Sequence, residues 1–195
     1  MEPYLKLSED NSRRAFEIIE ELGIVPAWES IGAEVRQVGS LAMGLMMKHL
    51  DIDFHIYSPM LDPAADFKVM AHLAGDEYVK RVEYRNLSAT DEACIEWHLW
   101  REEPDGAQWQ IDMIHIRSGS RYDGYFERMA ERIASVMTQR QRQTILRLKY
   151  ETPDSEKIAG VEYYQAVIRD GVGTYPQLER WRKDNPLTGI AEWMP

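Results

Sequence analysis

The sequence of 195 residues contains a single cysteine, Cys94, and lacks any hydrophobic run of membrane-spanning length. One cysteine excludes an intramolecular disulfide and a zinc cluster of several thiolates, and it favours a cytoplasmic setting. The sequence therefore gives no indication of a membrane protein, and its charged first residues are not those of a signal peptide. We expect a soluble, cytoplasmic protein.

Positive charge is also scarce. Lysine and arginine together number 23 against 33 acidic residues, which leaves a net charge of −10. Phosphate backbones are bound mainly through lysine and arginine, so a nucleic-acid partner is disfavoured. A small or cationic partner is more compatible with this balance. Hydrophobic residues make up 44% of the chain, which is enough for a globular core.

The chain is organised around residues 35–57. Residues 35–38 form a short strand-like segment that ends at Gly39 and Ser40. Residues 41–50 contain few strand formers, which predicts a helix of two to three turns. Residues 51–57 alternate polar and apolar side chains, the pattern of a strand with one wet face.

The polar face of this second strand carries two acids, Asp51 and Asp53. Like charges so close together repel each other unless a cation lies between them. An oxygen-rich pair suits a hard cation such as Mg²⁺. A zinc site of Asp51, Asp53 and His55 is disfavoured, because it lacks the open three-ligand pattern of hydrolytic zinc centres.

The Gly39-Ser40 turn complements these acids. Backbone N–H groups at the start of a helix attract anions, and glycine allows a ligand to approach closely. A phosphate at the turn and a metal at the carboxylates together describe a nucleoside-triphosphate site.

The order Val38-Gly39-Ser40, a helix-length spacer, then Asp51-Ile52-Asp53 in an apolar strand resembles the DNA polymerase β-like nucleotidyltransferase superfamily. The resemblance covers about residues 30–117. This sequence departs from the family pattern at Leu41 and Met43, which replace the basic residues that often follow Gly-Ser. Part of the phosphate contact must then come from elsewhere, such as Lys48 or the C-terminal segment.

In the resembling family a third acid on a neighbouring strand completes the metal site, and Asp112 is the natural candidate. It lies in the middle of a strand-like segment, residues 109–116, which follows residues 93–101 and a Pro104-Asp105-Gly106 turn that predicts a hairpin. A buried carboxylate on an apolar strand is costly unless it is paired or metal-bound. The alternative is a structural, hydrogen-bonded acid.

The resemblance implies a metal-dependent nucleotidyltransferase that moves a nucleoside monophosphate, AMP from ATP, onto a hydroxyl of a small molecule or protein and releases pyrophosphate. Two Mg²⁺ ions, with Mn²⁺ as an alternative, would be held by Asp51, Asp53 and Asp112. Gly39, Ser40 and Lys48 would bind the phosphates. Two other hypotheses stay open: an inactive nucleotide-binding or partner-binding module, antitoxin-like or regulatory, and a phosphohydrolase or nuclease.

Several other polar residues keep two interpretations. One of four basic residues in the C-terminal region could reach the triphosphate; otherwise they form a solvated helix face. These residues are Arg140, Arg142, Arg147 and Lys149. His98 either lines an acceptor cleft or lies on a solvated edge, whereas His115 is expected to pack on the opposite face. His55 could contact nucleotide, orient a carboxylate or be partly exposed.

The expected fold is α+β, a mixed, mostly antiparallel sheet with helices on one side and a helical C-terminal extension. We place the nucleotidyltransferase core at residues 1–117 and a helical subdomain at 118–195. A first helix is expected to be capped by Asn11 or Ser12 and to end at Gly23. Asp62 would cap a second helix, and Asp154 or Ser155 a later one. The oligomeric state stays open.

Overall fold

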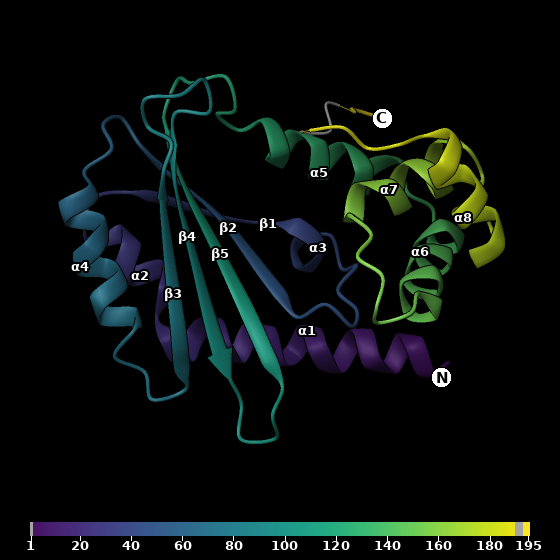
Figure 1. The fold of residues 1–195 in the computed structure, drawn as a ribbon, viewed down its shortest axis with the longest axis horizontal. Helices are drawn as coiled ribbons and strands as arrows, with labels where there is room; N and C mark the ends of the chain where they lie inside the picture. Colours follow the sequence, from purple (N-terminus) through teal and green to yellow (C-terminus); the bar gives the residue numbers. More distant parts are fainter. Residues whose placement is uncertain (1, 190–192) are drawn as a thin grey trace.

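The computed structural model describes residues 2–189 and 193–195. Its centre is a five-stranded sheet in the order β1-β2-β5-β4-β3 (Figure 1). Only β2 and β5 run parallel, and the other neighbouring pairs are antiparallel. The mixed, mostly antiparallel sheet and the β4–β5 hairpin are therefore confirmed. The strands are β1 (Glu34–Val38), β2 (Asp51–Ser58), β3 (Val79–Asn86), β4 (Cys94–Glu102) and β5 (Gln108–Arg117).

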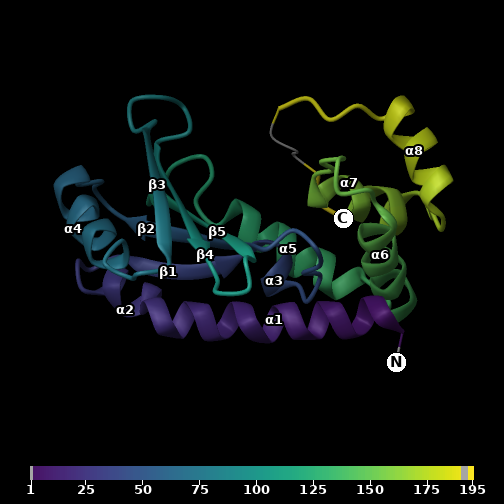
Figure 2. The ribbon, with the colours of Figure 1, turned by 60° about the horizontal axis from the view of Figure 1, so that its bottom comes forward.

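One face of the sheet is covered by helices α1 (Pro3–Leu22), α2 (Ile24–Glu29) and α4 (Pro63–Leu73), with α1 running along the sheet (Figure 2). The apolar side chains of β2, such as Ile52 and Phe54, are buried against these helices. Removal of this apolar surface from water is the main stabilising contribution. Strand alternation then leaves the acids of β2 on the opposite face.

A second group of helices lies beside the sheet (Figure 1). It has its own hydrophobic cluster, which also takes in Leu45 and Met47 from the first half of the chain. The division at residue 117 stays a prediction. Within the described ranges, no helix is both long and apolar enough to span a bilayer. The group comprises α5 (Tyr125–Val136), α6 (Gln139–Glu151), α7 (Gly160–Tyr164), the π-helical turn η1 (Gln165–Arg169) and α8 (Tyr175–Asp184).

The prediction of a helix over residues 41–50 is wrong. Helix α3 spans only Gly39–Ala42, and the chain then turns at Gly44, whose φ is +66°. Residues 45–47 follow without helix and are all buried: Met46 belongs to the sheet core, whereas Leu45 and Met47 belong to the helical cluster. Because neighbouring residues of this stretch belong to different hydrophobic clusters, tertiary packing overrides the local preference for helix.

The first helix also starts earlier than expected, at Pro3. Tyr4 and Leu5 pack against the helical cluster, so tertiary contacts extend the helix beyond its local cap signal. Its end at Gly23, with φ +62°, is confirmed. The predicted cap at Asp62 is also confirmed, because its side chain accepts from the N–H of Ala64.

The helix expected after Asp154 or Ser155 begins only at Gly160. There the side chain of Glu162 accepts a hydrogen bond from the N–H of Ala159, the residue before the helix. Asp154 instead pairs with Lys48. Its side chain is therefore engaged in a long-range contact rather than in a cap.

Candidate active site

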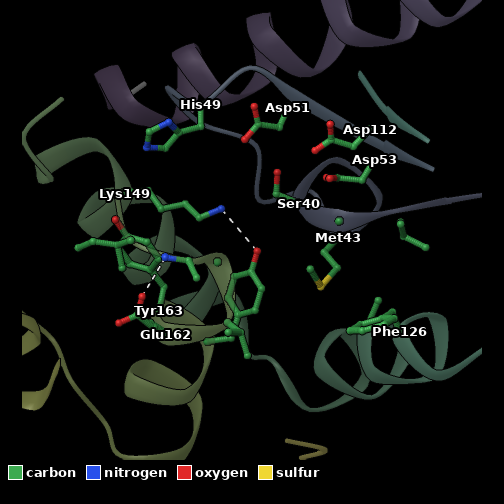
Figure 3. Close-up of a pocket in the computed structure, with 18 of the residues that line it drawn as sticks. Ser40, Met43, His49, Asp51, Asp53, Asp112, Phe126, Lys149, Glu162 and Tyr163 are labelled. Atoms are coloured by element: carbon green, nitrogen blue, oxygen red, sulfur yellow. Dashed lines mark hydrogen bonds between the residues drawn. The ribbon is translucent and has the colours of Figure 1, made fainter. Parts of the chain in front are cut away.

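The three predicted acids are brought together by the parallel pairing of β2 and β5. In that register Asp53 lies opposite Asp112, and Asp51 lies opposite Gln110. All of these side chains project from the face that α1, α2 and α4 leave uncovered. Figure 3 shows Asp51, Asp53 and Asp112 side by side at the edge of a pocket.

The glycine of the Gly-Ser turn packs directly on Asp53. A Cβ atom built at Gly39 would lie 1.9 Å from the Oδ2 atom of Asp53, and the φ angle of Gly39 is +72°. Both the lack of space and the left-handed backbone therefore require glycine. Ser40 follows immediately and lines the same pocket (Figure 3). Because α3 is a single turn, the predicted anion site at this turn offers local backbone N–H groups and the Ser40 hydroxyl rather than a long helix dipole.

The acids raise one another's pKa. Burial, followed by the negative charges of Asp112 and Asp51, raises the pKa of Asp53 to about 7. Burial and the charge of Asp112 also raise the pKa of Asp51. Such a cluster holds its full negative charge at neutral pH only at a cost in free energy, and a cation between the carboxylates removes that cost.

The oxygen-only donors fit a hard divalent cation better than zinc or copper. The acids are more widely spread than Glu92, Cys94 and Glu96, the one group of three or more such side chains among the described residues whose ligand atoms all lie within 4.8 Å of one another. A wider spread suits two ions that share carboxylates. The pocket offers Asp51, Asp53 and Asp112 as the residues that could hold them.

The Glu92-Cys94-Glu96 group lies at the start of β4. Burial raises the pKa of the Cys94 thiol to about 12, so the thiol stays protonated at neutral pH. The carboxylate of Glu96 lies 3.4 Å from Arg85. Because thiolate, not thiol, is the metal ligand, this group is a poorer donor set than the three aspartates.

A pocket of about 1090 Å³ extends from the acids to the second group of helices. Its walls include the Gly-Ser turn, the site face of β2 and β5, and residues of α5 and α7. Small-molecule sites commonly occupy pockets of this order of size, about 300–1,000 Å³. The volume and the acids at one end make it the candidate active site.

Of the four basic candidates of the C-terminal region, Lys149 is the one that lines the pocket. Figure 3 shows the Lys149 side chain in the pocket. Its Nζ atom lies 2.8 Å from the carbonyl oxygen of Leu45 and 3.5 Å from the hydroxyl of Tyr164. Burial lowers the pKa of Lys149 to about 8, while the charges of Asp53 and Asp51 favour its protonated form. A buried ammonium group beside the acids is well placed to contact a bound polyphosphate.

The other candidates have different partners. Arg142 donates to the carbonyl of Gly44, Arg147 donates to the carbonyl of Gly173, and Arg140 is exposed. Lys48 lines the pocket, but its Nζ atom bonds the carbonyl of Thr152 and lies 2.6 Å from Asp154. Its predicted phosphate contact would require this pairing to open.

Asp112 has hydrogen-bonding partners of its own. The Nδ1 atom of His98 lies 2.7 Å from its Oδ1 atom, and Gln110 donates to both carboxylate oxygens, at 2.9 and 3.1 Å. This bond to Asp112 raises the pKa of His98. The sequence indicated His98 only as one of two alternatives and did not indicate Gln110, because hydrogen bonds across strands depend on register.

His55 is buried and helps to attach α5 to the sheet. Its Nδ1 atom lies 3.2 Å from Glu127 Oε1, and the hydroxyl of Tyr57 donates to the same oxygen at 2.6 Å. Hydrogen bonds from His55 and Tyr57 outweigh burial and lower the pKa of Glu127. The ring of His55 also meets Phe126 edge-on, at 5.4 Å between centroids. Of its three predicted roles, partial exposure is wrong because His55 is buried, nucleotide contact stays a prediction, and the carboxylate that it contacts is that of Glu127.

No protein-family model matches the sequence, and no curated protein matches it either. Solved structures do match. The structure resembles Cid1, described for its RNA terminal uridylyl transferase activity, with a TM-score of 0.53 and 15% identity over 86% of this chain and 52% of that chain. A cytoplasmic RNA terminal U-transferase matches with a TM-score of 0.51 and 16% identity, over 86% of this chain and 53% of that one.

The GLD-2 complex with RNP-8 matches with a TM-score of 0.51 and 12% identity, over 91% of this chain and 57% of that chain. The chain thus spans about half the length of the structures it resembles. At such low identity the likeness establishes the fold alone. The fold is the one shared with these structures, and the fold that the sequence resemblance implied is therefore confirmed.

Proposed function

We propose that this chain is a metal-dependent nucleotidyltransferase that transfers a nucleoside monophosphate from a nucleoside triphosphate to a hydroxyl group. The observation that carries the proposal is the convergence of Asp51, Asp53 and Asp112 on the Gly39-Ser40 turn at one end of a large pocket. The neighbouring structures support the same class, because they are nucleotidyltransferases, and one of them is described with MgGTP bound. Two Mg²⁺ ions, or Mn²⁺, fit the oxygen donors.

The protein's own groups would bind the triphosphate from two sides. Gly39 and Ser40 would contact phosphate oxygens through backbone N–H groups and the Ser40 hydroxyl. Lys149 would contact them from the helical side, and Lys48 would do so if its bond to Asp154 opened. Asp51, Asp53 and Asp112 would hold the divalent ions, which would neutralise charge on the attacking and leaving oxygens.

Asp112 lies on the strand farther from the turn and would face the acceptor. It would accept the proton of the acceptor hydroxyl as that oxygen forms a bond to the α-phosphorus. The bond from the α-phosphorus to its bridging oxygen breaks, and pyrophosphate leaves. The attacking and leaving oxygens would lie in line across the phosphorus.

We propose ATP as the donor and a small molecule or protein as the acceptor. The net charge of −10 disfavours RNA, although the neighbouring structures include RNA terminal transferases. A cationic acceptor would suit the acidic surface. The single, buried cysteine agrees with a cytoplasmic setting.

The test measures product formation from nucleoside triphosphates labelled at the γ-phosphate, with Mg²⁺ and either an aminoglycoside or a short oligoadenylate RNA as acceptor. Labelled pyrophosphate that disappears in Asp53→Asn supports transfer, whereas labelled free phosphate indicates a phosphohydrolase. Lengthening of the oligoadenylate, followed with triphosphates labelled at the α-phosphate, would overturn the proposed acceptor class but keep the reaction.

The runner-up is an inactive nucleotide-binding module. It is favoured by the lack of basic side chains at Leu41 and Met43, directly after the turn. Calorimetry with Mg²⁺ and a non-hydrolysable ATP analogue separates the two hypotheses. Binding without pyrophosphate release from any of the four nucleotides would favour the inactive module, and absence of binding would contradict both.

A further inference from the structure

The three acids differ in how their side chains are held. Among the described residues, Asp112 has side-chain hydrogen bonds from His98 and Gln110, whereas none joins a side chain to Asp51 or Asp53. Asp53 is confined by its packing on Gly39. Asp112 lies on a different strand, so its carboxylate needs separate support to keep a fixed orientation toward the other two.

The order of the strands determines from which side His98 contacts the Asp112 carboxylate. Because β5 lies between β2 and β4, Asp112 has Asp53 opposite it on one side and His98 opposite it on the other. His98 binds the Oδ1 atom, which draws that oxygen toward β4. The Oδ2 atom has only the 3.1 Å contact from Gln110 and keeps free acceptor capacity.

Gln110 is itself fixed. The Nε1 atom of Trp100 donates to its Oε1 atom at 3.2 Å, so the amide nitrogen is the end that faces Asp112. The guanidinium of Arg81 stacks on the Trp100 ring at 3.6 Å from the ring centroid. A chain of contacts thus runs across three strands to one carboxylate.

We propose that His98 and Gln110 are positioning residues, which hold the Asp112 carboxylate with Oδ2 directed toward Asp53 so that a divalent ion can bind between the two strands. This inference rests on the proposed function. Groups that hydrogen-bond to metal ligands typically change metal affinity or activity by about 10- to 100-fold when they are removed. In this role both residues would act on the ion through Asp112 and not as ligands themselves.

The test compares binding of Mn²⁺ alone, followed by the paramagnetic resonance signal of free Mn²⁺, with the melting temperature of each variant. His98→Phe fills the space without a donor, and His98→Asn keeps an N–H near the Nδ1 position. Gln110→Met removes the second donor. His72→Phe is the matched control, because His72 is exposed on α4 beyond the other face of the sheet.

We expect Asp112→Asn to lose one bound ion and the His98→Phe and Gln110→Met variants to bind that ion about 10-fold more weakly. His98→Asn should stay within about threefold of the wild type, and His72→Phe should match it. In pyrophosphate-release assays, kcat should fall in His98→Phe and Gln110→Met while KM for the nucleotide stays constant.

Wild-type Mn²⁺ affinity in both His98→Phe and Gln110→Met would overturn the inference, and so would equal weakening in His98→Asn and His98→Phe. If His98→Phe has a lowered melting temperature, the Mn²⁺ affinity of the folded Gln110→Met variant decides whether the positioning role holds. Should Asp112→Asn itself keep both ions at wild-type affinity, the metal site of the proposed function fails. If Asp112→Asn loses an ion while the His98 and Gln110 variants bind Mn²⁺ like the wild type, the positioning role is wrong but the proposed metal site stands.

Discussion

Strand β5 carries two aspartate–histidine pairs, one on each face of the sheet. On the site face Asp112 bonds His98, and both side chains are about one quarter exposed, at 22% and 25%. On the core face His115 bonds Asp66, and these side chains are 1% and 0% exposed. The bonding atoms are alike, with Nδ1 to carboxylate distances of 2.7 and 2.9 Å.

The surroundings decide what each pair can do. Asp66 also accepts from the indole N–H of Trp97, and His115 packs edge-on against Trp28, so that pair is enclosed by core side chains. Asp112 instead borders the pocket and neighbours Asp53. An enclosed pair contributes to stability, whereas a pair beside like charges and open space remains available for binding. The pairing alone does not distinguish them.

Asp112→Asn changes the pair on the site face and should have the largest effect, a loss of activity. We expect pyrophosphate release to fall by about 10³-fold, because both an ion ligand and the proton acceptor are lost. The melting temperature should change little, since the side chain is partly exposed. Steady-state kinetics and thermal melts check both points. Wild-type activity in this variant would contradict the proposed function.

Asp66→Ala removes the buried pair with His115 and should lower the stability of the protein. It leaves a buried histidine nitrogen and the Trp97 indole N–H without their partner, and we expect unfolding to become easier by about 3 kcal/mol. Urea denaturation measures this loss. Mn²⁺ affinity of the folded variant should match the wild type, whereas altered affinity would show that the core pair also influences the site.

Asp53→Asn should sharpen the contrast by making the protein more stable without metal. The pKa of Asp53 in the folded protein is about 7, above its ordinary value of 3.8, so the folded state retains a proton that the unfolded chain releases between these values. Stability therefore falls as pH rises through this window. At pH 8 the variant should be more stable by about 2 kcal/mol, and at pH 4 the two proteins should be equal.

Denaturation in chelator at both pH values gives the measurement for Asp53→Asn. Added Mg²⁺ should stabilise the wild type at pH 8 more than the variant, because the variant lacks one carboxylate ligand. An equal difference between the two proteins at pH 4 and pH 8 would show that charge repulsion at Asp53 does not govern stability.

Glu83→Gln should have the smallest effect. The ion pair of Glu83 with Arg81 spans 2.6 Å on the exposed strand β3, but its side chains are 53% and 56% exposed. Exposed pairs typically contribute about 0.2–1 kcal/mol, and we expect a change below about 0.5 kcal/mol with unaltered Mn²⁺ binding. A larger loss would mean that exposure is a poor guide to the difference between the two aspartate–histidine pairs.

Local patterns in the sequence predicted much of the site. The alternation of residues 51–57 placed Asp51 and Asp53 on one face, and the Gly-Ser turn indicated where the chain approaches them. The same alternation correctly placed His115 on the face opposite Asp112. Each of these features depends on a few consecutive residues.

Predictions failed where distant residues compete with local preference. Composition favoured a helix over residues 41–50, but Leu45, Met46 and Met47 are shared between two hydrophobic clusters and lie outside any helix. Packing of Tyr4 and Leu5 likewise moved the start of α1 toward the N-terminus. Burial of apolar surface outweighs propensities of less than about 1 kcal/mol per residue.

The sequence by itself determined which side chains share a strand face and where glycine is needed, because backbone geometry repeats every two residues along a strand. Only the tertiary structure decided that Asp53 faces Asp112, that His98 bonds Asp112, and that Lys149 rather than the three arginines lines the pocket with the acids. Strand register and helix packing set these choices, since they depend on contacts between residues far apart in the chain.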